Sequence, residues 1–311
     1  MKINKNTKVL ILGGGGMLGE AVYNVFSRVA QVMCTDINTQ ESHISYLDIR
    51  DHSAVKETVE QYNPELIIHL GALTDLEYCE LHPYEAFATN SVATKNVANI
   101  AKELNIPMVY ISTAGIFDGK QEYYIDSDTP NPISVYGQSK YDGEVYVQHN
   151  VQKHFIFRAG WMMGGGPKRD KKFVNKIMKQ IESGSKELFV VDDKLGTPTY
   201  TYDFAVNMLY VVQQDAFGLY NMICDGSCSR YDVAQELIKI INRPDIKLFK
   251  VSSDHFKQEY FATRPASEKL IPKRLKDSNL YIMRPWKQCL REYLQKQWNT
   301  SGYMAGSSYS A

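Results

Sequence analysis

Short apolar runs alternate regularly with longer amphipathic stretches over the first 160 residues, and this rhythm most constrains how the chain folds. We expect strands at 9–12, 31–35, 44–47, 66–70, 108–112 and 155–158, and helices at 17–28, 52–62, 84–104 and 136–148. Strand–helix alternation at this spacing predicts a doubly wound parallel sheet with helices on both faces. The strands are mostly apolar rather than alternating, as expected for strands that are covered on both sides.

The pattern changes after residue 160. The segment 164–172 is rich in glycine and then in basic residues, which predicts a flexible basic loop, and helices are expected at 173–182, 203–213 and 231–241 with a short strand at 218–222. We therefore predict a sheet domain formed by 1–160 and 196–223, and a smaller mixed α/β lobe formed by 161–195 and 224–300. The segment 301–311 is small and polar and is expected to be a disordered tail.

Composition excludes several classes of function. The 35 Lys and Arg balance the 35 Asp and Glu, which argues against a nucleic-acid or anionic-membrane partner. No apolar run approaches the length of a membrane span, and the first residues do not resemble a signal peptide. The five cysteines are scattered and odd in number, which predicts free thiols in a reducing cytoplasm. Cys224 and Cys228 have metal-site spacing but no second ligand pair accompanies them, so no metal site is expected.

A glycine-spaced turn, with Gly13, Gly16 and Gly19, follows the first predicted strand and opens the first predicted helix. Missing Cβ atoms allow a tight turn, close approach of a pyrophosphate and close helix–strand packing. The helix start at Met17 and Leu18 then offers free N–H groups and a positive dipole end to the phosphates. The alternative is a merely flexible glycine loop, but the strand–loop–helix context favours a Rossmann-type dinucleotide site.

Asp36 ends the second predicted strand, at the distance expected for an acid that binds the adenosine ribose. A carboxylate there accepts from both ribose hydroxyls and repels a 2′-phosphate, and neither Ile37 nor Asn38 supplies a cation. NAD(H) is therefore favoured over NADP(H). Asp48 and Ile49, after the third strand, are candidates to hold adenine, although Asp48 could equally cap a helix.

Tyr136 and Lys140 lie four residues apart, so a helix places both side chains on one face. A phenol titrates near pH 10, and an adjacent ammonium lowers that pKa and makes the phenol a usable acid or base. In a chain with 21 tyrosines, roughly one or two such pairs are expected by chance. Thr113 ends the fifth predicted strand, where ligands bind in open parallel sheets, and its hydroxyl can bond a substrate carbonyl.

The order of these features resembles the extended short-chain dehydrogenase/reductase superfamily, and within it the dTDP-4-dehydrorhamnose reductase family. The resemblance spans nearly the whole chain. It rests on matching stretches at Gly13–Gly19, His69–Ala72 with Asp75, Cys79 and Glu80, Asn90, Ser112–Gly119, Tyr136–Lys140, Arg158–Trp161, Gly196–Thr199 with Asp203–Ala205, and Arg264–Ser267. Each stretch is common, but their joint order is specific.

The resemblance implies hydride transfer from a nicotinamide to the C4 ketone of a nucleotide-linked 4-keto-6-deoxysugar. Tyr136 would be the proton donor, Lys140 would lower its pKa and hold the nicotinamide ribose, and Thr113 would polarise the ketone. The stretches also imply cofactor contacts at Leu70, Gly71, Ala72 and Asn90, and substrate contacts at Ala114, Trp161, Lys172 and Arg264. Trp161 could equally be a core residue, and the lysines of 168–172 could be a solvated charged run.

The chain departs from the family directly after Thr113. The rhamnose enzymes have Asp and Tyr there, beside the sugar, whereas this chain has Ala114 and Gly115. The related 4,6-dehydratases need an acid/base pair at these positions, so dehydration is excluded. The competing interpretations are an NAD-dependent nucleotide-sugar epimerase and a non-catalytic regulatory relative. Relatives suggest a homodimer through the helices at 84–104 and 136–148.

Overall fold

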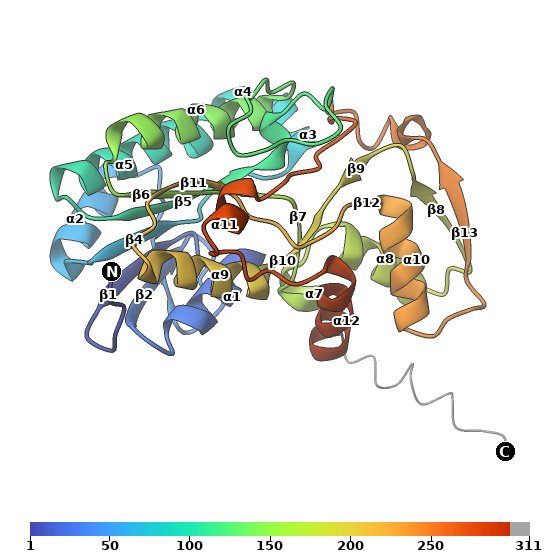
Figure 1. The fold of residues 1–311 in the computed structure, drawn as a ribbon, viewed down its shortest axis with the longest axis horizontal. Coiled ribbons are helices and arrows are strands. Elements are labelled where there is room, and N and C mark those ends of the chain that lie inside the picture. Colours follow the sequence, from blue (N-terminus) through green and yellow to red (C-terminus); the bar gives the residue numbers. More distant parts are fainter. Residues whose placement is uncertain (299–311) are drawn as a thin grey trace, which may run out of the picture.

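The computed structural model describes residues 1–298 and confirms the doubly wound parallel sheet (Figure 1). Seven strands pair in the order β11-β6-β5-β4-β1-β2-β3, all parallel. They are β1 (Lys8–Leu12), β2 (Gln31–Asp36), β3 (Ile44–Tyr46), β4 (Leu66–His69), β5 (Met108–Thr113), β6 (His154–Ala159) and β11 (Gly218–Asn221). The winding direction reverses between β1 and β4, and ligands bind such sheets outside the strand ends at this reversal.

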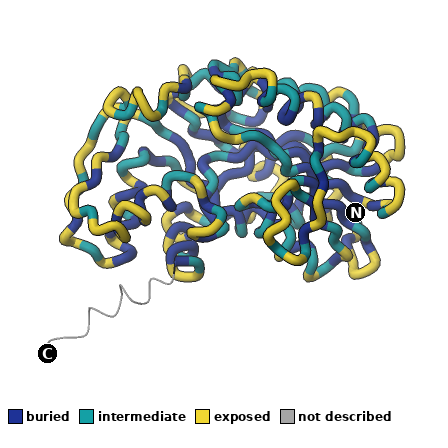
Figure 2. The backbone as a smooth tube through the Cα atoms, turned by 180° about the vertical axis from the view of Figure 1, so that it is seen from behind, coloured by how far each residue is buried: buried dark blue, intermediate teal, exposed yellow. Residues whose placement is uncertain are grey.

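Helices cover both faces of the sheet (Figure 1). One face carries α2 (His52–Tyr62), α5 (Ala93–Glu103) and α6 (Val135–Asn150), and the other carries α1 (Met17–Phe26) and α9 (Thr201–Gln213). Leu10 and Leu12 pack in the first layer, Val9 and Ile11 in the second, and all four are fully buried. The central strands are accordingly the most continuously buried part of the backbone (Figure 2). Burial on both faces explains why these strands are apolar throughout.

Helix α6 begins at a defined position because two side chains bond its first turn. The Ser134 hydroxyl accepts from the N–H of Gly137 at 3.1 Å, and Glu80 accepts from the N–H of Val135 at 2.9 Å. Side-chain oxygens at these places satisfy N–H groups that have no partner within the helix. The start of α6 fixes the height of Tyr136 above the sheet edge.

The helix expected at 84–104 is divided. Its place is taken by α4 (Pro83–Phe87), a π-helical segment (Ala88–Val92) and α5, and a separate short helix, α3 (Leu76–Leu81), precedes them. A π segment inserts extra residues into a helical turn and often marks a functional position. Here it carries the fully buried Asn90.

The second lobe is more regular than the sequence suggested. Small sheets pair β7 with β10, β9 with β12, and β8 with β13. The elements beyond the seven-stranded sheet and its covering helices are β7 (Trp161–Met163), α7 (Gly166–Arg169), α8 (Phe173–Glu182), β8 (Glu187–Val191), β9 (Leu195–Gly196), β10 (Pro198–Tyr200), β12 (Cys228–Ser229), α10 (Arg230–Ile240), β13 (Lys247–Val251), α11 (Lys273–Asp277) and α12 (Trp286–Gln297). One 3₁₀ turn, Ala114–Ile116, directly follows β5 of the large sheet, and another spans Ser253–Phe256. The segment 164–172, which was expected to be a flexible basic loop, contains the short helix α7.

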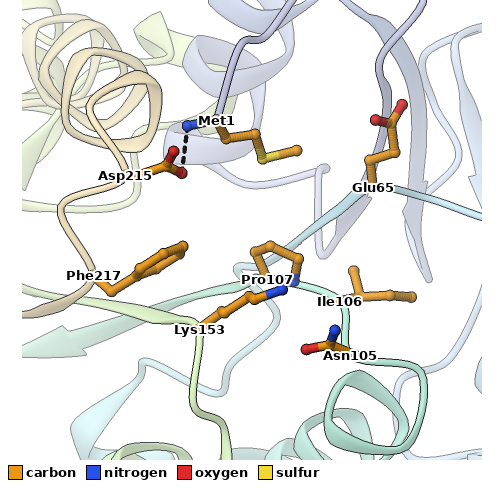
Figure 3. Close-up of a pocket in the computed structure, with 8 residues that line it drawn as sticks. All are labelled: Met1, Glu65, Asn105, Ile106, Pro107, Lys153, Asp215 and Phe217. Carbon is orange, nitrogen blue, oxygen red and sulfur yellow. Dashed lines mark ion pairs between the residues drawn. The ribbon is translucent and has the colours of Figure 1, made fainter.

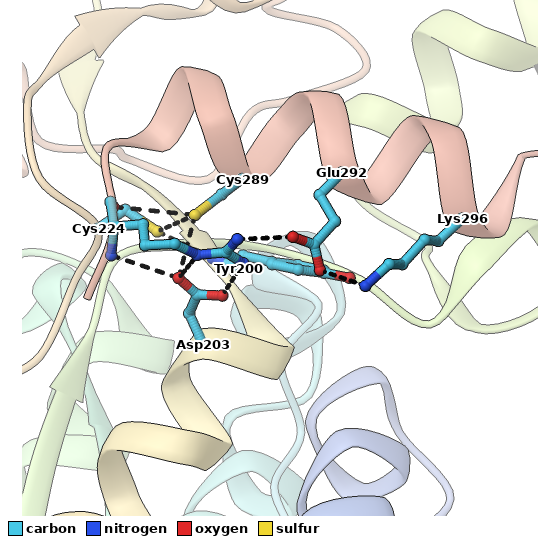
Figure 4. Close-up of polar contacts among 7 residues, drawn as sticks. Tyr200, Asp203, Cys224, Cys289, Glu292 and Lys296 are labelled. Carbon is cyan, nitrogen blue, oxygen red and sulfur yellow. Dashed lines mark hydrogen bonds and ion pairs between the residues drawn. The ribbon is translucent and has the colours of Figure 1, made fainter. Parts of the chain in front are cut away.

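The last described helix, α12, is tied to the sheet domain by a charged network (Figure 4). Arg284, just before α12, bonds Asp203 of α9 at 2.8 Å and Glu292 of α12 at 2.6 Å, and Lys296 bonds Glu292 at 2.8 Å. These carboxylates hold the pKa of Arg284 above its usual value. The Sγ atoms of Cys224 and Cys289 lie 3.6 Å apart beside the network.

The last expectations concern disulfides, membrane spans and metal sites. All five cysteines are free and buried. Within residues 1–298, no helix is long and apolar enough to cross a bilayer, and no three His, Cys, Asp or Glu side chains gather as metal ligands. The predicted tail at 301–311 lies outside the described residues.

Candidate active site

The glycine turn forms a cradle with one open side. A Cβ on Gly13, whose φ is +87°, would lie 2.3 Å from the Gly71 nitrogen, and one on Gly19 would lie 2.2 Å from the Gly14 oxygen. Gly16 differs, because a Cβ there would meet no atom within 4 Å. Gly13 and Gly19 therefore permit close backbone packing, whereas Gly16 borders empty space at the start of α1, where no side chain caps the helix. These residues fit a dinucleotide pyrophosphate.

Met17 and Leu18, which follow the glycine turn, differ in their exposure to the groove. Met17 lines the groove beside the turn, whereas the side chain of Leu18 is buried in the core under α1. Leu18 can thus offer a cofactor only its backbone N–H.

Asp36 stands at the end of β2, directly against the turn. Its carboxylate accepts from the N–H of Gly15 at 2.9 Å and from the N–H of Asn38 at 2.8 Å. Each carboxylate oxygen has more than one lone-pair site, so both can still accept from a ribose. The position matches that of the ribose-binding acid in Rossmann folds.

The residues expected around adenine and the second half of the cofactor line the same edge. The Ile49 side chain lies 2.7 Å from where a Cβ on Gly71 would stand, and the N–H groups of Leu70 and Gly71 bond the Leu12 carbonyl at the end of β1. The half-exposed Ala72 continues this loop. Asp48 is already engaged, because Arg50 bonds it at 2.6 Å and this bond lowers its pKa.

Asn90 acts through its neighbours. Its amide accepts from the N–H of Leu73 at 2.8 Å and donates to the Leu73 carbonyl and the Ser139 hydroxyl, both at 3.0 Å. The π-helical segment thereby joins the loop after β4 to α6. The structure gives Asn90 the geometry of a residue that positions the cofactor edge relative to the Tyr136 helix.

Thr113 and Tyr136 come together at the carboxyl end of β5. The Thr113 hydroxyl accepts from the N–H of Gly115 at 3.1 Å and also bonds Tyr136. Burial raises the pKa of Tyr136 to about 12, while the bond to Thr113 acts in the opposite direction. The lowered phenol pKa expected from Lys140 is therefore not found in the free protein, and Tyr136 is protonated at neutral pH.

Lys140 is buried one turn beyond Tyr136. Its ammonium lies 4.2 Å from the centre of the Tyr110 ring, and the residue is only 4% exposed. Burial lowers the pKa of Lys140 to about 7, while Glu144 acts to raise it. A buried amine that titrates near neutral pH is typical of functional sites.

The basic segment borders the groove beside the glycine turn. A groove of ≈ 290 Å³ is lined by Gly15, Gly16, Met17, Asn38, Gln40, Glu41, Ile44, Thr74, Asp75, Lys168, Arg169, Lys171 and Lys172. Arg169 pairs with Glu20 at 2.7 Å and Glu41 at 2.9 Å, while Lys172 donates to the Thr74 carbonyl at 2.9 Å. The segment therefore lies against the predicted cofactor site, and Arg169 and Lys172 are half-buried rather than freely solvated.

Trp161 belongs to a cluster that sequence reasoning missed. Its indole N–H donates to Glu268 at 2.7 Å, and the Arg230 guanidinium lies 3.6 Å above its ring. A Cβ on Gly196 would stand 2.3 Å from that ring, so the backbone of β9 packs directly against it. Glu268 directly follows the Arg264–Ser267 stretch, which was a usable signal, whereas nothing in the sequence singled out Arg230.

Two predicted substrate residues have protein partners. Arg264 pairs with Glu77 at 2.7 Å, so its guanidinium is already neutralised. The Ala114 side chain is buried with Ile116 and Phe117 in a small core cluster. A substrate diphosphate would have to compete for Arg264, and only the backbone of Ala114 can face a sugar.

A second hollow, of ≈ 510 Å³, lies away from this chemistry (Figure 3). It is lined by Met1, Glu65, Asn105, Ile106, Pro107, Lys153, Asp215 and Phe217. Most of these residues directly precede strands of the parallel sheet, so the hollow lies at the amino ends of the strands. The catalytic candidates lie at the opposite, carboxyl edge.

Fold and site together define an extended short-chain dehydrogenase/reductase: a seven-stranded parallel sheet with a glycine cradle, an acid after β2, and Thr113, Tyr136 and Lys140 at one edge. The chain belongs to the family described as RmlD substrate binding domain, whose pattern matches residues 7–298.

Curated relatives resemble the chain over most of its length. The spore coat polysaccharide biosynthesis protein SpsK of Bacillus subtilis is 27% identical over 300 residues, covering 94% of this chain and 98% of that protein. A dTDP-4-dehydrorhamnose reductase of Sinorhizobium fredii is 29% identical over 255 residues, covering 78% and 84%. Methionine adenosyltransferase 2 subunit beta of Xenopus tropicalis is 26% identical over 253 residues, covering 79% and 76%.

Solved structures of dTDP-4-dehydrorhamnose reductases are also similar to this chain over most of its length. The dTDP-4-dehydrorhamnose reductase of Yersinia enterocolitica is 32% identical with a TM-score of 0.84, covering 93% of this chain and 99% of that one. The Bacillus anthracis reductase, solved in complex with NADP, is 28% identical with a TM-score of 0.81, covering 94% and 99%.

Proposed function

We propose that this protein is an NAD(P)H-dependent reductase of the C4 ketone of a nucleotide-linked 4-keto-6-deoxysugar. One observation carries the proposal: Tyr136 and Thr113 meet at the same sheet edge as an open dinucleotide cradle. Relatives named as dTDP-4-dehydrorhamnose reductases support this reaction class.

The side chains are suited to polarise and protonate a carbonyl. A bound nicotinamide cofactor supplies the hydride. Tyr136 holds a proton at neutral pH, because its pKa is about 12, and donates it to the carbonyl oxygen as negative charge develops there. Thr113 offers the same oxygen a second hydrogen bond. Lys140, buried beneath, stabilises the phenolate that remains.

NADH is the favoured cofactor in this proposal because Asp36 stands at the end of β2. The structure adds a counterweight that the sequence did not reveal, since Lys168 and Arg169 line the same groove. Both pair with Glu41, at 2.9 Å each, and Arg169 also pairs with Glu20 at 2.7 Å, so two carboxylates offset the two positive charges. The direct repulsion of a 2′-phosphate by Asp36 therefore favours NADH over NADPH.

The proposal also includes a cytoplasmic location, a homodimer and a small-molecule substrate. The buried free cysteines support a reducing cytoplasm. Tyr84, 86% exposed on α4, and Val92, 52% exposed on the π-helical segment, support a homodimer through this face. The balanced charge supports a small-molecule substrate rather than nucleic acid.

The test is an oxidation screen with NADH and NADPH over dTDP-, UDP-, GDP- and CDP-linked 4-keto-6-deoxysugars. Cofactor loss in step with product formation supports the proposal. Interconversion of two hydroxy sugars without net cofactor loss would replace it with an epimerase. Cofactor binding without any turnover would replace it with a regulatory relative, and NMR of the product gives the stereochemistry.

A further inference from the structure

The turn after Thr113 leaves a space beside the proposed reacting groups. A Cβ on Gly115 would stand 3.5 Å from the Thr113 hydroxyl oxygen, 3.7 Å from Cε1 of Tyr136 and 3.7 Å from Oε1 of Glu268. Three side chains from separate parts of the chain thus face one point. Because Gly115 contributes no atoms there, the Glu268 carboxylate borders the same space as the two proposed catalytic residues.

Glu268 is held firmly in this position. Its N–H donates to the Leu195 carbonyl at 2.7 Å, and the Trp161 indole fixes Oε2 at 2.7 Å. Trp161 is itself confined by the Gly196 backbone on β9. No side chain among residues 1–298 donates to the other oxygen, Oε1, which is the atom of Glu268 that lies nearest the Cβ position of Gly115. One carboxylate oxygen of Glu268 is therefore bound, and the other has no such donor and faces Gly115.

The charge of Glu268 is supported from nearby. The Arg230 guanidinium stacks on Trp161. Burial lowers the pKa of Arg230 to about 10, and the negative charge of Glu268 is the largest effect in the opposite direction. The half-buried Glu268 carboxylate and the half-buried Arg230 guanidinium therefore lie close enough to attract each other. An anionic carboxylate accepts hydrogen bonds and donates none.

We propose that Glu268 is a specificity-determining residue whose Oε1 accepts a hydrogen bond from the 3-hydroxyl of the sugar. The inference rests on the proposed reductase function. In a 4-keto-6-deoxysugar the C4 ketone has two ring neighbours, C3 with a hydroxyl and C5 with a methyl group. Only the 3-hydroxyl is a donor beside the ketone that Thr113 and Tyr136 hold. Glu268 thereby supplies a polar contact that Ala114 and Gly115 cannot make.

The experiment compares kcat/KM for the 4-keto-6-deoxysugar that the screen finds most active and for its 3-deoxy counterpart. Glu268→Ala is expected to lower kcat/KM about 10- to 100-fold for the 3-hydroxy sugar, as for the loss of one charge-assisted hydrogen bond. The 3-deoxy sugar should change by less than about threefold, because it never made this bond. Glu268→Gln keeps the size and can still accept from Trp161, but it offers an N–H in place of Oε1, which can donate to the 3-hydroxyl without the charge, so its selective loss should be smaller than that of Glu268→Ala.

Glu187→Gln, an exposed carboxylate at the start of β8, is the matched control and should leave both substrates unaffected. Equal losses on both sugars, or no loss on either, would overturn the role of Glu268 while leaving the reductase proposal intact. A wild-type protein that reduces no 4-keto sugar would overturn the proposed function, and the role of Glu268 with it. Cofactor affinity and Tm identify a variant that has merely lost its fold.

Discussion

The two sides of the candidate site are built in different ways. The cofactor side consists of backbone placed by short stretches of sequence: a glycine turn after β1, the end of β2 and the loop after β4. The substrate side depends on side chains that meet only in the folded chain, as Trp161 and Glu268 do across 107 residues. Backbone motifs can be predicted locally, whereas a site assembled from distant side chains needs the structure.

The largest effect should come from Tyr136, where the two sides meet. Tyr136→Phe removes the proposed proton donor and keeps the ring, so kcat should fall on the order of 10³-fold with cofactor affinity retained. Steady-state kinetics and a fluorescence titration with NADH measure the two quantities.

Tyr146→Phe is the control on the same helix. It removes a hydroxyl that donates to Asn99 at 2.8 Å, away from the site, so only stability should fall, by about 1 kcal/mol. Equal activity of Tyr136→Phe and the parent would exclude Tyr136 from the reaction.

The cradle itself can be broken in two distinguishable ways. Gly16→Val projects methyl groups into open space where a pyrophosphate is expected, so the Kd for NADH should rise about 100-fold, or roughly 2.7 kcal/mol, with little change in Tm. Gly13→Ala collides with backbone at a positive φ and should destabilise the fold by about 2 kcal/mol. Calorimetry and thermal melts separate the two effects, and unchanged NADH binding by Gly16→Val would contradict the cradle.

Asp36 tests the cofactor preference. Asp36→Ser removes the carboxylate that repels a 2′-phosphate, so the ratio of kcat/KM for NADH to that for NADPH should fall by about tenfold or more. A parent protein that already prefers NADPH strongly would show that Lys168 and Arg169, not Asp36, dominate the groove.

The pH profile tests the role of Lys140. Lys140 loses its proton as pH rises through about 7, and with it the positive charge that stabilises the phenolate of Tyr136. The value of kcat/KM should therefore be constant in acid and decline above neutral pH, approaching about tenfold per unit. Buffered assays from pH 5.5 to about 9 test this, and Lys140→Met should be nearly inactive throughout.

Much of the fold followed from sequence because the strands are uniformly apolar and the helices are amphipathic. The helices at 52–62 and 173–182 have the predicted bounds. The π-helical segment at Asn90 was not predicted, because it depends on contacts with Leu73 and Ser139. The β8–β13 pair was also missed, since its strands are brought together by tertiary packing.

The sequence predicted where the site residues lie better than it predicted their pKa values. The spacing of Tyr136 and Lys140 placed both residues correctly on α6, but burial determined their pKa values, and it acted on each in the opposite sense to a simple charge pair. The basic segment near Lys172 was expected to face a substrate or solvent, yet it borders the groove beside the glycine turn. The domain boundaries and the roles of individual residues stay predictions.

The central claim is that this edge of the sheet transfers hydride to a sugar ketone. The most direct measurement uses NADH with deuterium at both C4 positions of the nicotinamide ring, the active 4-keto-6-deoxysugar, and NMR of the product. We predict one deuterium at C4 of the sugar for each cofactor oxidised. A product without deuterium, or turnover without cofactor oxidation, would contradict the account.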